Sequence, residues 1–67
     1  MVIRVNGKEM DLDTPATLLQ LMQQLHLEQK KGIAVAVNQQ VVPAAGREQH
    51  LLQENDQALI IQAAQGG

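Results

Sequence analysis

The sequence predicts an α+β domain in which a mixed sheet of four to five strands wraps around a single helix. An Asn-Gly pair separates two short alternating segments near the start, only one stretch has helical periodicity, and two later runs are rich in β-branched residues. The chain has 67 residues and no cysteine. One small aliphatic core, without disulfides, must therefore hold the domain together.

An antiparallel hairpin is predicted for residues 1–5 and 8–12. Asn6 and Gly7 lie between these two segments. Both residue types accept the positive φ that a type I′ turn requires, so the pair is a strong hairpin signal. Strand alternation then gathers the larger apolar side chains on one face: Met1, Ile3, Val5, Met10 and Leu12.

The only helical spacing follows the hairpin, with apolar residues at i, i+3, i+4 and i+7, namely Leu18, Leu21, Met22 and Leu25. Two starts compete for this helix. Thr14 could cap it with Pro15 in the first position, or Thr17 could form a capping box with Gln20. We favour Thr17 because the periodicity begins there. Gly32 serves the exit of the helix or the loop beyond it.

Three further segments complete the predicted sheet. Residues 33–37 are predicted to form an interior strand, and residues 41–42 a brief edge strand, because Pro43 lacks an amide donor. Residues 58–63 form the last strand, after a turn at Asn55-Asp56. Residues 44–53 show no clean period, although Leu51 and Leu52 are expected to point inward.

A single helix covers the face of a sheet only by lying across it, so this order of elements predicts a β-grasp. A ferredoxin-like plait would need a second helix, for which residues 44–53 are a poor candidate. We expect the β-grasp domain to span residues 1–63 and a flexible C-terminal tail to span residues 64–67.

Composition excludes several classes of function. The sequence has no Ser, Cys or Tyr to act as a nucleophile. A formal net charge of -2 and the absence of aromatic residues argue against binding to nucleic acid. The longest apolar run, residues 33–37, is too short to span a membrane, and no signal peptide is recognisable. We expect a cytoplasmic protein that binds no metal.

The sequence ends in Gly66-Gly67. Chain ends are often glycine-rich and frayed, and an inert tail is one interpretation. The functional interpretation is that a backbone without Cβ atoms threads a narrow channel of a partner protein. The reactive group is then the α-carboxylate of Gly67, which is an anion at neutral pH and must be activated by another protein.

The chain resembles the ThiS family over essentially its whole length. The likeness rests on residues 2–7, on residues 35–38 followed by 39–43, on Asp56 and on the Gly-Gly end. One departure is Asn55, where the family usually has Gly before Asp. Because Asn also tolerates the left-handed conformation, we expect little consequence.

The resemblance implies a carrier cycle centred on Gly67. An E1-like adenylyltransferase of the ThiF type uses ATP and Mg²⁺ to form an acyl-adenylate at Gly67, and a sulfurtransferase or cysteine desulfurase relay converts it to a thiocarboxylate. Thiazole synthase of the ThiG type consumes that sulfur. Gln65 and Gly66 thread the partner's active site, and the chain itself binds no cofactor. The alternatives are a molybdopterin synthase small subunit, protein conjugation through Gly67, and a β-grasp interaction module with an inert tail.

Docking to such partners needs a surface, and the last strand is apolar on both faces. Hydrophobicity alone would bury Leu59 and Ile61, whereas analogy with ubiquitin-like strands turns Ala58 and Ile60 inward. We follow the analogy. The exposed docking patch then comprises Val2, Ala34, Ala36, Leu59 and Ile61.

Overall fold

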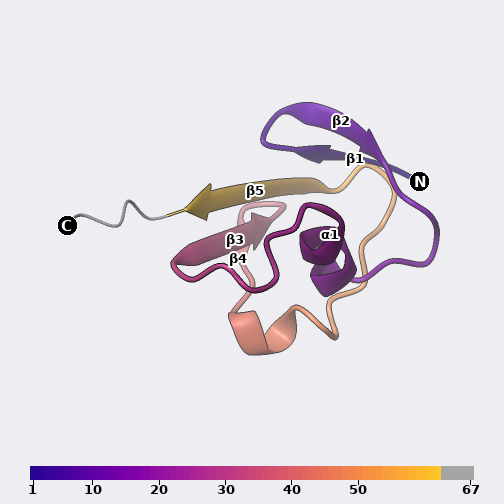
Figure 1. Cartoon of the computed structure of the whole chain (residues 1–67). Helices are drawn as coiled ribbons and strands as arrows, with labels where there is room; N and C mark the ends of the chain where they lie inside the picture. The colour runs from indigo at the N-terminus through magenta and orange to yellow at the C-terminus, as the bar shows by residue number, and fades with distance from the viewer. Residues whose placement is uncertain (63–67) are drawn as a thin grey trace.

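The computed structural model describes residues 1–62. It contains strands β1 (Val2–Val5), β2 (Lys8–Asp11), β3 (Ile33–Val37), β4 (Gln40–Val41) and β5 (Gln57–Gln62), helix α1 (Leu18–Gln24) and a 3₁₀ turn η1 (Ala44–Gly46). The strands form one mixed sheet in the order β2-β1-β5-β3-β4, and α1 lies across one face of it (Figure 1). The predicted β-grasp fold is confirmed. The predicted tail, residues 64–67, and Ala63 at the predicted domain boundary lie outside the described residues.

The predicted hairpin is present. β1 and β2 pair antiparallel, with Ile3 opposite Met10 and Val5 opposite Lys8. Asn6 and Gly7 connect the two strands with φ angles of 51° and 84°, as a type I′ turn requires.

Helix α1 begins at the predicted cap. The hydroxyl of Thr17 accepts a hydrogen bond from the backbone N–H of Gln20 at 3.2 Å, and the Gln20 side chain accepts one from the backbone N–H of Thr17 at 2.7 Å. This reciprocal pair is a capping box, so Thr17 rather than Thr14 starts the helix. The side chains of Leu18, Leu21 and Met22 are fully buried and anchor the helix to the sheet.

The helix ends earlier than the lysine-rich segment at residues 30–32. His26 takes the left-handed conformation with φ 60°, and its N–H donates to the carbonyl of Gln23 at 3.0 Å. The N–H of Leu27 donates to the carbonyl of Met22 at 2.8 Å. These two bonds form a Schellman motif. Gly32, with φ 75°, serves the loop that leads into β3.

β5 occupies the centre of the sheet. It runs parallel to β1 and antiparallel to β3, and the predicted register of its side chains is confirmed. Ala58 is 4% exposed and Ile60 packs against the core, whereas Leu59 and Ile61 are 50% and 54% exposed. Both faces of this strand are apolar in the sequence, so its place among its neighbours decides which face is buried.

One prediction about the segment before β5 is wrong. Leu52 is buried, but Leu51 is 56% exposed. The segment is extended here. Leu51 forms an isolated antiparallel β-bridge with Thr17, and the N–H of Leu52 donates to the carbonyl of Ala16 at 2.8 Å. Neighbouring side chains of an extended segment point in opposite directions, so only one of the two leucines reaches the core.

A polar cluster fixes the start of β5. Asp56 is almost fully buried, and its two carboxylate oxygens accept hydrogen bonds from Asn38 Nδ2 at 2.9 Å and from the N–H of Gln53 at 2.8 Å. Asn38 Oδ1 in turn accepts from the N–H of Gln57 at 3.0 Å. Asn55 has φ 70°, so it adopts the left-handed conformation that we expected it to tolerate at this turn.

Candidate functional site

The face of the sheet that points away from α1, called here the outer face, carries four of the predicted docking residues side by side. The register of β3 on β5 places Ala34 opposite Ile61 and Ala36 opposite Leu59. Side chains directly opposite each other on adjacent strands are in contact range. The large side chains of Leu59 and Ile61 are therefore flanked by two alanines, and all four form one apolar surface.

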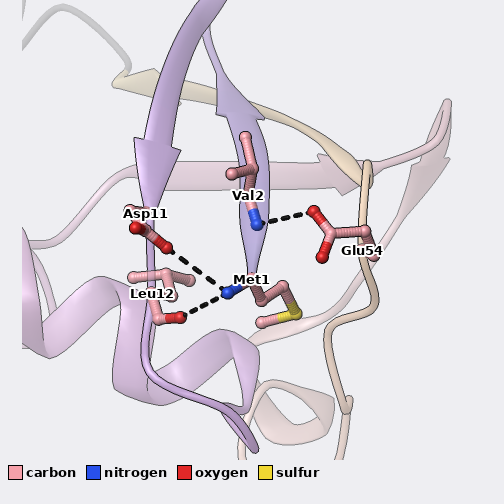
Figure 2. Close-up of polar contacts among 5 residues, drawn as sticks. All are labelled: Met1, Val2, Asp11, Leu12 and Glu54. Atoms are coloured by element: carbon pink, nitrogen blue, oxygen red, sulfur yellow. Dashed lines mark hydrogen bonds and ion pairs between the residues drawn. The ribbon is translucent and has the colours of Figure 1, made fainter.

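Val2, the fifth predicted docking residue, does not join them. The register of β1 on β5 pairs Arg4 with Gln57, so Val2 lies beyond the start of β5, beside Asp11 of β2. Its N–H donates to Glu54 Oε2 at 2.7 Å, next to the contacts of the Met1 ammonium with Asp11 and Leu12 (Figure 2). Val2 belongs to the opposite end of the outer face.

Val41 is an apolar residue of this surface that sequence reasoning missed. It lies opposite Ala36 on the edge strand β4 and is 74% exposed. Only the register of β3 with β4 places Val41 on this surface. That register cannot be predicted from the sequence of a two-residue strand beside a proline. The apolar patch of the outer face, so named from here on, consists of Ala34, Ala36, Val41, Leu59 and Ile61.

The relief of the apolar patch follows from side-chain size. Both alanines of β3 lie beside the larger side chains of β5, and Ala36 also has Val41 of β4 on its other side. The alanines therefore form a low strip beside Leu59 and Ile61, bounded at Ala36 by Val41. A partner's side chain can bury apolar area there without displacing any residue of this chain.

Polar residues of β1, β5 and the turns that join β1 to β2 and β3 to β4 border the apolar patch. An open hollow begins at Leu59 and Ala36 and is lined on its polar side by Arg4, Asn6, Gln39 and Gln57. The charged outer-face positions of the strands, Arg4, Glu9 and Asp11, all lie on β1 and β2. An apolar area beside a polar rim is the usual composition of a protein-binding surface.

Comparison with known proteins decides the family. The sequence model of the ThiS family matches residues 3–67. The chain belongs to the ThiS family. It is 37% identical over 67 residues to the sulfur carrier protein ThiS of Escherichia coli (strain K12), and the alignment covers 100% of both chains.

Solved structures show the same fold as this ThiS-family chain. The crystal structure of the thiamine biosynthesis protein (ThiS) from Geobacter metallireducens superposes with a TM-score of 0.83 at 22% identity, covering 100% of both chains. SAMP1 from Haloferax volcanii superposes with a TM-score of 0.62 at 16% identity, covering 98% of this chain and 97% of that one. At these identities the likeness concerns the fold alone.

The residues expected to carry the chemistry of this ThiS-family chain, Gln65, Gly66 and Gly67, lie outside the described residues. Gly67 follows Gln62, the last residue of β5, by five positions. Such a segment spans at most about 17 Å when fully extended. A group attached to Gly67 is therefore never far from the end of β5, and β5 also carries Leu59 and Ile61 of the apolar patch.

Residues 1–62 of the ThiS-family chain contain neither a metal-binding cluster nor a membrane-crossing helix. Among residues 1–62, no group of three or more His, Cys, Asp or Glu side chains is arranged to hold a metal ion. No helix of this part is long and apolar enough to cross a membrane. Arg4 is the one charged residue among those lining the hollow of the outer face, so that hollow offers hydrogen bonds and apolar contact.

Proposed function

We propose that this ThiS-family chain is a sulfur carrier for the thiazole ring of thiamine. The α-carboxylate of Gly67 is adenylated, converted to a thiocarboxylate, and then donates its sulfur. The observation that carries the proposal is the match with the sulfur carrier protein ThiS of Escherichia coli, which extends over the full length of both chains and includes Gly66 and Gly67.

The chemistry explains why other proteins must act on Gly67. An α-carboxyl group has a pKa of about 3.3–3.7, so at neutral pH it is an anion and a poor electrophile. An E1-like adenylyltransferase, using ATP and Mg²⁺, lets a carboxylate oxygen attack the α-phosphorus and releases pyrophosphate. A sulfur nucleophile, delivered by a sulfurtransferase or a cysteine desulfurase relay, then attacks the acyl carbon and AMP leaves. Thiazole synthase takes up the sulfur.

The geometry supports a carrier that docks outside while its end reacts inside the partner. The apolar patch offers Leu59 and Ile61, each about half exposed, to a partner's surface. Gly67 lies within about 17 Å of the end of the strand that carries both residues. In this arrangement Gln65 and Gly66 enter the active site, where glycine without a Cβ atom passes a narrow channel. The cytoplasm supplies the ATP for this step.

Adenylation is tested by ATP–pyrophosphate exchange with an E1-like adenylyltransferase of the ThiF type. We expect exchange with the full chain and none after deletion of Gly67. Gly46→Ala is the matched glycine control, because an added Cβ there meets only ordinary contacts, the nearest being Val42 Cγ1 at 3.7 Å. Exchange that survives the deletion, or is absent with the full chain, contradicts the proposal and favours an inert interaction module.

The sulfur step is tested by the intact mass of the protein from its native host. A thiocarboxylate adds about 16 Da, the mass by which sulfur exceeds oxygen. The purified thiocarboxylate is then offered separately to thiazole synthase and to the large subunit of molybdopterin synthase. Sulfur transfer to thiazole synthase supports the proposal. Transfer to the molybdopterin enzyme alone, or an isopeptide bond from Gly67 to a lysine, contradicts it.

A further inference from the structure

The side chain of Asn6 continues the pairing of β1 with β5 after the backbone of β1 has turned away. The last backbone hydrogen bond between the two strands is a regular one, from the N–H of Asn6 to the carbonyl of Ala58 at 2.9 Å. The chain then enters the hairpin turn. At this point Asn6 Oδ1 accepts a hydrogen bond from the N–H of Ile60 at 2.7 Å, and Asn6 Nδ2 donates to the carbonyl of Ile60 at 3.2 Å.

A side-chain amide thus occupies the place of a peptide group. Both backbone groups of Ile60 on the β1 side are satisfied, and the edge of β5 stays closed one step beyond the end of β1. The position also demands a left-handed backbone, since Asn6 has φ 51°. Glycine meets the backbone demand but has no amide, and aspartate lacks the donor. Asparagine meets both demands at once.

This contact holds the part of β5 from which the C-terminal end begins. Ile60 lies between Leu59 and Ile61, the two β5 residues of the apolar patch, and precedes Gly67 by seven positions. The other edge of β5 is paired with β3 as far as Gln62. With Asn6 in place, β5 is held on both edges around Ile60, so the two patch residues and Gln62, the last residue of β5, share one fixed frame.

We propose that Asn6 is a positioning residue for the delivery of Gly67. Its amide keeps the end of β5 in the sheet, so that the tail leaves the domain at a constant place relative to the apolar patch. The inference that a fixed end of β5 helps to deliver Gly67 to a partner rests on the proposed carrier function. The hydrogen-bonding step is independent of that function and can be measured by itself.

The hydrogen-bonding step is tested by amide hydrogen exchange in the full chain. Asn6→Gly keeps the turn conformation and removes both side-chain bonds. We expect the amide of Ile60 to exchange at least about tenfold faster, while the Leu21 amide, bonded to Thr17 within the helix start, keeps its rate. Asn6→Asp retains the acceptor alone and gives an intermediate rate.

Asn55→Gly is the matched control for this experiment. Asn55 also has a positive φ, and its N–H donates to the carbonyl of Val2 at 2.8 Å, a backbone bond that glycine retains. We expect its replacement to leave the Ile60 rate unchanged. Equal acceleration at Ile60 and Leu21 in Asn6→Gly, or none at either, overturns the proposal, because the amide then acts on global stability only or not at all.

The delivery step is tested by the kinetics of adenylation. A carrier whose competent conformation is less populated has a higher apparent dissociation constant. We therefore expect Asn6→Gly to raise the KM for the carrier up to about tenfold and to leave kcat unchanged, whereas Asn55→Gly changes neither. Faster exchange at Ile60 with an unchanged KM overturns the positioning role. Absence of adenylation with the unaltered chain refutes the carrier function itself and leaves the exchange result standing.

Discussion

At the scale of single residues, short polar side chains fix both ends of the central strand. Asp56 and Asn38 bind backbone or each other at the start of β5, and Asn6 binds Ile60 near its end. In a chain without aromatic residues or cysteines, these bonds add to a small aliphatic core. Asp56 is the buried member of this set. A buried donor left without its acceptor costs more than the bond itself contributes, so loss of the Asp56 carboxylate should have the largest effect.

Asp56→Ala tests the cluster at the start of β5. The substitution removes the acceptors of Asn38 Nδ2 and of the Gln53 N–H. We expect the free energy of unfolding to fall by about 2 kcal/mol, measured by urea denaturation followed by circular dichroism. Asp13→Ala is the control, because Asp13 is exposed and outside the cluster. Equal midpoints for Asp56→Ala and the unaltered chain would contradict this role.

The sequence predicts the backbone demand at these positions but not the side-chain partners. Asn-Gly predicts a left-handed turn at Asn6, and the same tolerance is expected at Asn55. The hydrogen bonds from Asn6 to Ile60 cross 54 positions of the sequence. They depend on β1 and β5 being neighbours, which no local pattern shows.

At the scale of elements, the start of α1 could be predicted and its end could not. The capping box is local, because its two members lie three residues apart, and the apolar periodicity marks where it belongs. The end of α1 falls at His26 in the left-handed conformation, a position where glycine is usual. No glycine marks this end in the sequence, so the Schellman hydrogen bonds that close the helix are seen only in the structure.

Thr17→Ala tests the predicted helix start. The substitution removes the acceptor of the Gln20 N–H and should lower the free energy of unfolding by about 1 kcal/mol. Thr14→Ala removes the competing cap and should cost less than about 0.5 kcal/mol. Thermal or urea unfolding monitored at a helical wavelength compares the two. A larger loss in Thr14→Ala would show that the first turn of the helix begins earlier in solution.

At the scale of the whole molecule, the sheet separates a core face from a contact face. The inward residues of β5 and β3 pack on α1, and the alternate residues of the same strands form the apolar patch. Both faces of β5 are apolar in the sequence. The prediction that Ala58 rather than Leu59 is buried therefore depends on the analogy with ubiquitin-like strands, because hydrophobicity alone favours Leu59. That Val41 belongs to the apolar patch is seen only from the register of β3 with β4. That Val2 lies apart from the patch is seen only from the register of β1 with β5.

Leu59→Glu tests this division of the sheet. Leu59 is half exposed, so we expect the free energy of unfolding to change by less than about 0.5 kcal/mol. A charge in the centre of an apolar contact should raise the KM for the carrier in adenylation at least about tenfold. The measurements are urea unfolding and ATP–pyrophosphate exchange.

Ala58→Glu is the matched control on the opposite face. Ala58 is 4% exposed, and a charge there must be buried without a partner, so we expect loss of folding. Two other results would contradict the assignment of the faces. One is unfolding of Leu59→Glu, and the other is normal adenylation of Leu59→Glu at low carrier concentration.

The central position of β5 has a consequence for biosynthesis. The strand that joins the β1–β2 hairpin to the β3–β4 pair is the last one in the chain, so the two halves of the sheet have no common neighbour until residues 57–62 have been translated. Pairing of the first and last strands is also the most non-local contact of the fold, and such contacts are slow to form. A nascent chain that stops before β5 cannot complete this sheet.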